Sequence, residues 1–269
     1  MGKIDYRAVE FGLALGHTQL DPQAVTDFLT PGVLDALEMP AECFLQPDPE
    51  FQRRLNACEF KTVSAGSLMA PDLTRTIPFV AENYRRDFAE QAGVMVRTLV
   101  RSGANGAFLG FDLGRILGNT EAENAALDII RRLIPTLYRE QFELLIPFRV
   151  PFHGSDAIRA SALMGQFLRG TLTPLVKLSL DVHPFEVKPD EDKADMVGML
   201  PCEARQAVLI YDADCGNHIT AAQFRPWAEL LATKLFRGRY MLCPRSIRNR
   251  MLIPEADLFA KMVSDLRNE

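Results

Sequence analysis

The sequence predicts one (β/α)8 barrel of the TIM type, an α/β fold in a single domain that spans residues 1–269. Short apolar segments alternate with helical segments eight times, and a chain of about 250 residues has the size of this fold. The fourth to eighth apolar segments are apolar throughout, as expected for parallel strands covered on both faces. No change of composition and no low-complexity run divides the chain.

The first half of the chain contains four of the predicted strands, which are Val9–Gly16, Glu42–Gln46, Glu59–Ser64 and Gly106–Phe111. A helix over 22–37 is predicted to begin after Asp21, an N-cap residue that precedes Pro22. Only a short connection, Pro49–Leu55, follows the second strand. The longest helix, 76–101, carries apolar residues at spacings of three and four, and Gly103 is a good terminator for it.

The second half contains the other four predicted strands, which are Phe142–Val150, Val176–Asp181, Gln206–Asp212 and Arg239–Cys243. Thr120 followed by Glu123 predicts a capping box at the start of a helix that runs towards Tyr138. Pro147 interrupts the fifth strand, so its end is expected to be irregular or edge-like. Further helices are expected near 155–168, 191–199, 221–236 and 254–266.

An open, doubly wound sheet is the alternative fold. It would be expected to carry a glycine-rich phosphate loop after its first strand. The segment Gly12-Leu-Ala-Leu-Gly16-His17 lacks the dinucleotide spacing, which favours the closed barrel and predicts no nucleotide cofactor.

Composition narrows the function classes. A net charge of −5 and a pI near 5.5 argue against a nucleic-acid partner bound through its phosphates. The sequence contains no secretion signal and no apolar run long enough to span a membrane, so neither secretion nor a membrane is expected. Five widely spaced cysteines without a CxxC pair predict reduced, mainly buried thiols in a cytoplasmic protein. A basic cluster is interpreted as solvated surface with one or two arginines facing a pocket; its members are Arg237, Arg239, Arg245, Arg248 and Arg250.

All four histidines follow the end of a predicted strand. In a (β/α)8 barrel the carboxyl ends of the strands form the face where catalytic groups converge. The candidate residues at these ends are His17, Gln46, Ser64, Ser67, Asp112, Arg115, Arg149, His153, Asp181, His183, Asp212, Asp214, His218 and Arg245. The simpler interpretation of each aspartate alone is a turn cap.

Asp181 and His183 form the most informative pair, because residues i and i+2 of a strand project to the same face. Together they suit a divalent metal, or an aspartate that orients a histidine acting as a general base. The alternative is a hydrogen bond that only stabilises the rim. Asp212 and Asp214 share a face by the same argument, and the nearby Cys215 is not expected to be a nucleophile beside two carboxylates.

The segment Val176-Lys-Leu-Ser-Leu-Asp181-Val-His183, together with the order of the segments, resembles the xylose-isomerase-like TIM barrels. That superfamily contains sugar and sugar-phosphate isomerases and epimerases and related apurinic endonucleases. The resemblance implies that Asp181 and His183 are metal-site residues, although the family spacing is more often DxxH than DxH. The family also places a metal-binding Glu after strand five, a His after strand seven and a Glu after strand eight, where this chain has Arg149, Asp212 and Arg245.

Two hypotheses follow. In the first, the protein is an enzyme that isomerises or epimerises a small sugar-like substrate by acid/base proton transfer. Asp181, His183 and Asp212 would then act as acid and base or hold one divalent metal (Mn, Mg or Zn), while Arg149 or Arg245 would bind an anionic group. The substrate site would be completed by His17, Asp112, His153, Asp214 and His218. In the second, the barrel has lost metal and activity and serves as a ligand-binding or assembly protein. The sequence leaves the number of subunits open.

Overall fold

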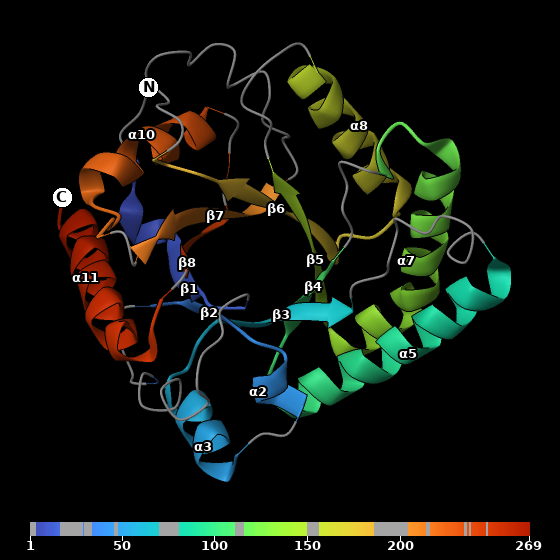
Figure 1. Cartoon of the computed structure of the whole chain (residues 1–269), viewed down its shortest axis with the longest axis horizontal. Helices are drawn as coiled ribbons and strands as arrows, with labels where there is room; N and C mark the ends of the chain where they lie inside the picture. The colour runs from blue at the N-terminus through green and yellow to red at the C-terminus, as the bar shows by residue number, and fades with distance from the viewer. Residues whose placement is uncertain are drawn as a thin grey trace.

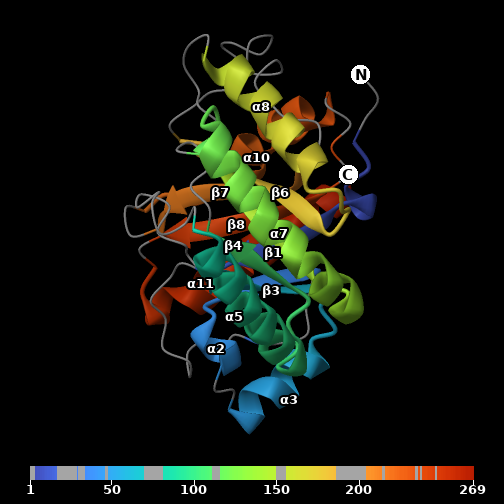
Figure 2. The ribbon, with the colours of Figure 1, turned by 90° about the vertical axis from the view of Figure 1, so that its right-hand side faces the viewer.

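Eight parallel strands close into a barrel in this computed structural model. It describes residues 4–16, 29, 34–45, 48–69, 81–110, 116–149, 156–185, 204–213, 216–233, 236, 238–245 and 247–269, with the backbone alone for 69, 149, 156–160 and 249. The strands neighbour one another in chain order, and β8 closes the ring against β1. Helices surround this ring (Figures 1 and 2). The predicted (β/α)8 barrel is therefore confirmed.

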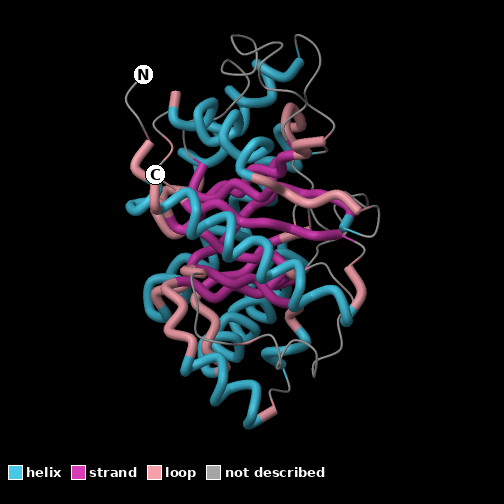
Figure 3. Tube along the Cα trace, turned by 90° about the vertical axis from the view of Figure 1, so that its left-hand side faces the viewer, coloured by secondary structure: helices cyan, strands magenta, loops and turns pink. Residues whose placement is uncertain are grey.

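The strands are β1 Glu10–Ala14, β2 Ala36–Met39, β3 Thr62–Met69, β4 Gly106–Leu109, β5 Glu143–Arg149, β6 Val176–Val182, β7 Ala204–Asp212 and β8 Arg239–Arg245. The helices of the described residues are α2 Glu42–Leu45, α3 Pro49–Ala57, α5 Glu82–Arg101, α7 Thr120–Glu140, α8 Asp156–Gly170, α10 Ala221–Ala232 and α11 Asn249–Arg267, and a 3-10 turn, η1, covers Tyr6–Ala8. Figure 3 shows the strands at the centre of the molecule with helices outside them.

The second strand is the main error of the sequence-based prediction. The strand is Ala36–Met39, and the segment predicted to be the strand forms helix α2 over Glu42–Leu45. Ala36–Met39 has only four residues and contains Glu38; its first two residues fall at the end of the predicted helix 22–37, and Glu38 and Met39 fall in no predicted element. All four residues are buried, because this short strand pairs with β1 and β3 inside the closed ring.

The third strand also lies further along the chain than predicted, over Thr62–Met69, so that Ser64 lies within the strand rather than at its end and Ser67 belongs to the strand rather than to the loop after it. Its residues are mostly small or hydroxylated, so the segment lacks the run of large apolar side chains by which other strands are recognised in the sequence. The connection Pro49–Leu55 forms helix α3, where Asp48 accepts a hydrogen bond from the Glu50 N–H. The last helix begins at Asn249, five residues before the predicted Pro254.

Pro147 has the edge-like environment that the sequence predicts. Strand β5 runs through it and pairs with β6 as far as Arg149. Its pairing with β4 is recorded only from Glu143 to Leu145, so this side of β5 has no paired strand at Pro147. A proline, which has no N–H, is tolerated in such a place. The helix after β4 is capped one residue earlier than predicted, since Asn119 accepts from the Ala122 N–H and Glu123 accepts from the Gly118 N–H.

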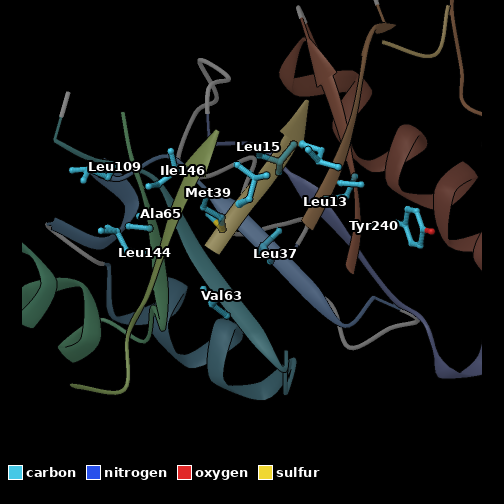
Figure 4. Packing of buried hydrophobic residues seen from close by; sticks show 14 of the residues in the cluster. Leu13, Leu15, Leu37, Met39, Val63, Ala65, Leu109, Leu144, Ile146 and Tyr240 are labelled. Carbon is cyan, nitrogen blue, oxygen red and sulfur yellow. The ribbon is translucent and has the colours of Figure 1, made fainter. Parts of the chain in front are cut away.

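The outer faces of the strands form the main hydrophobic core with the surrounding helices. Leu13, Leu37, Val63, Leu144 and Tyr240 belong to this cluster (Figure 4), and each alternates along its strand with a residue of the opposite face. A second, smaller cluster comes from that opposite face, with Ala14, Ala36, Val208, Ile210, Met241 and Cys243. No helix of the described residues is long and apolar enough to cross a membrane.

Arg239 identifies the inward-facing residues and corrects a prediction. Its guanidinium contacts Thr62 of β3, Glu143 of β5 and Gln206 of β7 at 3.1, 3.1 and 2.6 Å, which only a side chain inside the barrel can do. It was assigned to solvated surface, yet it is 2% exposed. We call these four residues the floor of the barrel, because they lie at or near the first residues of their strands.

Candidate functional site

Because side chains alternate between the two faces of a strand, every second residue from the floor onward also points into the barrel. This identifies the inward-facing side chains at the other end. From Gln206 and Arg239 the same face contains Asp212 and Arg245, the last residues of β7 and β8. In β6 the hydroxyl of Ser179 accepts a hydrogen bond from Gln206 at 3.3 Å, so Asp181 also belongs to the inward face. The register places Asp212 opposite Arg245 and Asp181 opposite Arg149. Each of these two aspartates therefore has an arginine opposite it on a neighbouring strand at this end of the barrel, which we call the mouth.

A cavity of about 120 Å³ lies at the mouth beside β6, β7 and β8. It is lined by His183, Phe185, Ile210, Tyr211, Asp212, Asn217 and Arg245. His183 is only 5% exposed, whereas Asp212 and Arg245 are exposed. The cavity is slightly smaller than the roughly 150 Å³ that admits benzene into an engineered protein cavity, so it fits a few non-hydrogen atoms of a small polar molecule.

Arg245 is suited to bind an anion. Within the described part of the chain it has no hydrogen bond or ion pair. Its guanidinium is exposed at the cavity, where it can exchange water for a carboxylate or phosphate in a two-pronged contact. The prediction that one or two arginines of the basic cluster face a pocket agrees with this position.

Glu38, which the sequence analysis did not select, is buried between the floor and the mouth. It accepts hydrogen bonds from the Gly16 N–H and the Gln206 side chain, while Oε2 has no partner among the described residues. Burial, followed by the negative charge of Asp181, raises the pKa of Glu38 to about 8, although the positive charge of Arg239 lowers it. Glu38 is therefore mostly protonated near neutral pH. The sequence signal was a single acidic residue inside a short apolar segment.

A second group that the sequence analysis missed lies on the outer side of β7. Glu255 of α11 is 4% exposed and accepts a hydrogen bond from the Tyr211 hydroxyl at 2.5 Å. Its other oxygen lies 2.7 Å from Nδ1 of His218. Burial, followed by the hydrogen bond to Glu255, raises the pKa of Tyr211, so its hydroxyl keeps its proton. Glu255 stands at helical spacing between the buried residues Leu252 and Phe259, and a carboxyl group on an apolar helix face is a signal that could have identified it.

Cys243 lies inside the barrel and is not activated as a nucleophile. Burial, followed by the negative charge of Glu38, raises the pKa of this thiol to about 12. Cys43 and Cys58 are also free thiols with raised pKa values. These three cysteines agree with the prediction of reduced thiols.

Several predicted site residues lie outside the described residues, namely His17, Gln46, Asp112, Arg115, His153 and Asp214, and so does Cys215, which is not a predicted site residue. The backbone of Arg149 is described but its side chain is not. Of the remaining candidates, the cavity brings together His183, Asp212 and Arg245, and His218 follows Asn217 of its lining. Asp181 lies on the inward face of β6, two residues before His183.

The described residues do not fit a divalent metal. No three histidine, cysteine, aspartate or glutamate side chains among them come together as a metal-binding group. Asp181, His183 and Asp212, the predicted ligands, are all described, and Arg245 lies opposite Asp212 and lines the same cavity. A cation beside these positions opposes metal binding. We therefore assign no chemical step to a metal.

Comparisons with known proteins identify the fold. Neither a protein-family model nor a curated protein matches this sequence. D-psicose 3-epimerase from Clostridium cellulolyticum H10 matches in structure with a TM-score of 0.60 at 11% identity, covering 96% of each chain. A 3-keto-D-glucoside 4-epimerase from E. coli gives 0.58 at 11% identity, covering 97% of this chain and 100% of the other. A xylose isomerase domain protein from Salmonella typhimurium LT2 gives 0.59 at 15% identity, covering 98% and 99%.

Identities of this size establish the fold alone. The chain has the xylose-isomerase-like (β/α)8 fold that the segment around Asp181 and His183 led us to expect. Its solved neighbours include sugar epimerases and proteins with xylose isomerase domains.

Proposed function

We propose that this protein is an isomerase or epimerase that moves a proton on a small, sugar-like substrate carrying an anionic group. The observation that carries the proposal is the cavity at the mouth, where His183, Asp212 and Arg245 line one space. A group able to take a proton, a group able to give one and a binding site for an anion are the minimum that this reaction needs. The sugar epimerases among the structural neighbours support the same class of substrate.

In the proposed mechanism, Arg245 binds the anionic group and so fixes the substrate in the cavity. His183 or Asp212 removes the proton from the carbon beside the carbonyl, the electrons of the broken C–H bond form a C=C bond, and the carbonyl π electrons move to the oxygen to give an enediolate. In an epimerase the other of these two groups delivers a proton to the opposite face of the same carbon, and the C=O bond forms again. In an isomerase the enediolate oxygen gains a proton, the hydroxyl on the neighbouring carbon loses one to form the new C=O bond, and the first carbonyl carbon is protonated. Asp181 lies two residues before His183 on β6, where it would orient the imidazole. His17, Asp112, Arg149, His153, Asp214 and His218 remain predicted substrate contacts.

A binding protein without turnover is the second candidate. Two observations favour it: the described residues offer no group of three metal-binding side chains, and arginines occupy two strand ends where the family carries carboxylates. Such a protein would bind the same anionic sugars at Arg245 without moving a proton.

Solvent exchange distinguishes the two candidates. The protein is incubated in D2O with ketoses, aldoses and their phosphates, and NMR follows deuterium entering the carbon beside the carbonyl. The enzyme incorporates deuterium, and His183→Asn or Asp212→Asn slows this by about 10²–10⁴-fold. Asp257→Asn, an exposed change on α11, is the matched control and leaves the rate unchanged. Binding of a sugar phosphate by calorimetry without any exchange would instead establish the binding protein.

A further inference from the structure

We propose that His218 is a second proton-transferring residue of the mouth, and that Glu255 and Tyr211 are the residues that position it. The proposal rests on the function proposed above. It assigns roles to two side chains, on β7 and α11, that the sequence does not connect with the site.

The first step is the orientation of the imidazole. Nδ1 of His218 lies 2.7 Å from an oxygen of Glu255, and a carboxylate has no proton to donate, so Nδ1 carries the hydrogen. Nε2 then has the free lone pair. No further partner of His218 occurs among the described residues, and the side chain is 38% exposed. The nitrogen that can accept a proton is therefore available to a ligand.

The second step is the fixation of Glu255. This carboxylate is 4% exposed and both oxygens are used, one by His218 and one by the Tyr211 hydroxyl. Tyr211 belongs to β7, whose end is part of the rigid barrel, and Glu255 to α11. A carboxylate held by a strand leaves the histidine little freedom, as in other sites where a carboxylate selects the tautomer of a catalytic imidazole.

The third step connects this group to the cavity. Tyr211 itself lines the cavity, and so does Asn217, the residue before His218. His218 is not itself a lining residue, but through Tyr211 and Asn217 the group adjoins the cavity that Asp212 and Arg245 line. Epimerisation requires proton removal from one face of a carbon and delivery to the other, which two groups from different segments can do. His183 comes from the end of β6, whereas His218 comes from the loop between β7 and α10.

The proton balance is simple. Neutral His218 accepts the proton from the substrate carbon at Nε2 and becomes imidazolium, and the negative charge of Glu255 stabilises this cation. The electron pair of the C–H bond enters the enediolate, and a proton from His183 or Asp212 completes the product. His218 returns its proton to that group, by way of solvent, before the next turnover.

The tautomer of His218 tests the orientation without any substrate. In protein labelled with ¹⁵N-histidine, the signal lost in His218→Asn identifies this residue, and its neutral form is expected to carry hydrogen on Nδ1. Glu255→Leu shifts the population away from that tautomer, and Tyr211→Phe shifts it less. Asp257→Asn on the same helix leaves it unchanged. A wild-type imidazole with hydrogen on Nε2, or one unaffected by Glu255→Leu in a folded protein, overturns the proposal.

Kinetic measurements then distinguish a catalytic role of His218 from a role in which it only stabilises the loop between β7 and α10. In the deuterium-exchange assay, His218→Asn lowers kcat by about 10²–10⁴-fold. Glu255→Gln, which keeps the shape but not the charge, lowers kcat by about 10–100-fold with little change in KM. The double variant is expected to be no slower than His218→Asn alone, because Glu255 acts through the histidine. If the loss of kcat in the double variant is instead the product of the losses in the two single variants, Glu255 does not act through His218 and the positioning role is overturned. Absence of exchange in the wild type overturns the proposed function, whatever the tautomer.

Discussion

Strands β7 and β8 pair a polar residue with an arginine at both ends of the barrel, and the two pairs differ completely in environment. At the floor, Gln206 lies opposite Arg239, and at the mouth Asp212 lies opposite Arg245. Arg239 is 2% exposed and its guanidinium contacts three side chains of the barrel. Arg245 is exposed and forms no ion pair within the described part of the chain.

The difference follows from desolvation. Burying a guanidinium away from water costs several kcal/mol of free energy unless hydrogen bonds replace its hydration. At the floor, Gln206, Thr62 and Glu143 provide these hydrogen bonds to Arg239. At the mouth the guanidinium stays hydrated and needs no protein partner. The floor therefore contributes to a unique, stable barrel, whereas the mouth remains free to bind a ligand. Four substitutions test this division, in order of decreasing effect on stability.

Arg239→Met is expected to have the largest effect. It removes the cation to which Glu143 and the side-chain oxygen of Gln206 are bonded inside the barrel, which costs about 3–5 kcal/mol of unfolding free energy. Equilibrium urea denaturation measures this loss. Glu143→Gln keeps the shape of the partner and should cost less, because Glu143 is 23% exposed. An Arg239→Met protein with wild-type stability would show that the floor does not stabilise the barrel.

Glu38→Gln is expected to change stability in a pH-dependent way. The pKa of Glu38 is about 8 in the folded protein and 4.5 in the reference state, so the folded protein binds this proton more tightly. The stabilisation is complete below pH 4.5 and is lost as the pH rises to about 8. The glutamine variant should therefore match the wild type below about pH 4.5, exceed it by a growing amount up to about pH 8 and exceed it by a constant amount above that.

Urea denaturation across this pH range measures the difference between the two proteins. Glu90→Gln, an exposed change on α5, is the control and should follow the wild type at every pH. A difference between wild type and Glu38→Gln that does not change with pH would mean that folding leaves the pKa of Glu38 unshifted, which contradicts the raised pKa expected from its burial.

The sequence predicts the mouth better than the floor. The strands β6, β7 and β8 are clear apolar segments that end in charged residues, so Asp181, Asp212 and Arg245 could be placed at one edge. The contacts of Arg239 could not be predicted, because Gln206, Glu143 and Thr62 lie 33, 96 and 177 residues away. Whether an arginine at a strand start faces water or three such partners depends on the closure of the ring.

The same limitation explains why the sequence analysis did not select Glu38 and Glu255. Periodicity assigns acidic residues to surfaces or strand ends, and each of these two is buried by a contact distant in sequence. Glu255 lies 44 residues from Tyr211 and 37 from His218. The histidine was selected because it follows a strand, but the carboxylate that orients it could only be found in three dimensions.

Gly66→Ala is expected to have an intermediate effect near the mouth. A Cβ at this position would lie 2.3 Å from Cα and 2.4 Å from the carbonyl oxygen of Gly16, and neither backbone atom can move away easily. The expected cost is about 1–3 kcal/mol. Gly93→Ala in α5 is the matched control, because its Cβ would lie 3.6 Å from Thr136 and an alanine stabilises a helix interior by about 0.5–1 kcal/mol. The midpoint temperature of thermal denaturation should therefore fall in Gly66→Ala and rise in Gly93→Ala.

Arg245→Met is expected to have the smallest effect on stability and the clearest effect on binding. An exposed side chain with no partner among the described residues contributes within about 0.5 kcal/mol to folding. Its charge-assisted hydrogen bonds to an anion are worth about 1.5–3 kcal/mol, so the affinity for a sugar phosphate should fall by at least about tenfold. Calorimetric titration measures this, with Arg248→Met, which lies outside the cavity lining, as the control. Equal affinity in both variants would mean that the anion is bound elsewhere. Arg245 at the mouth would then have no role in ligand binding, and the contrast with the floor would concern stability alone.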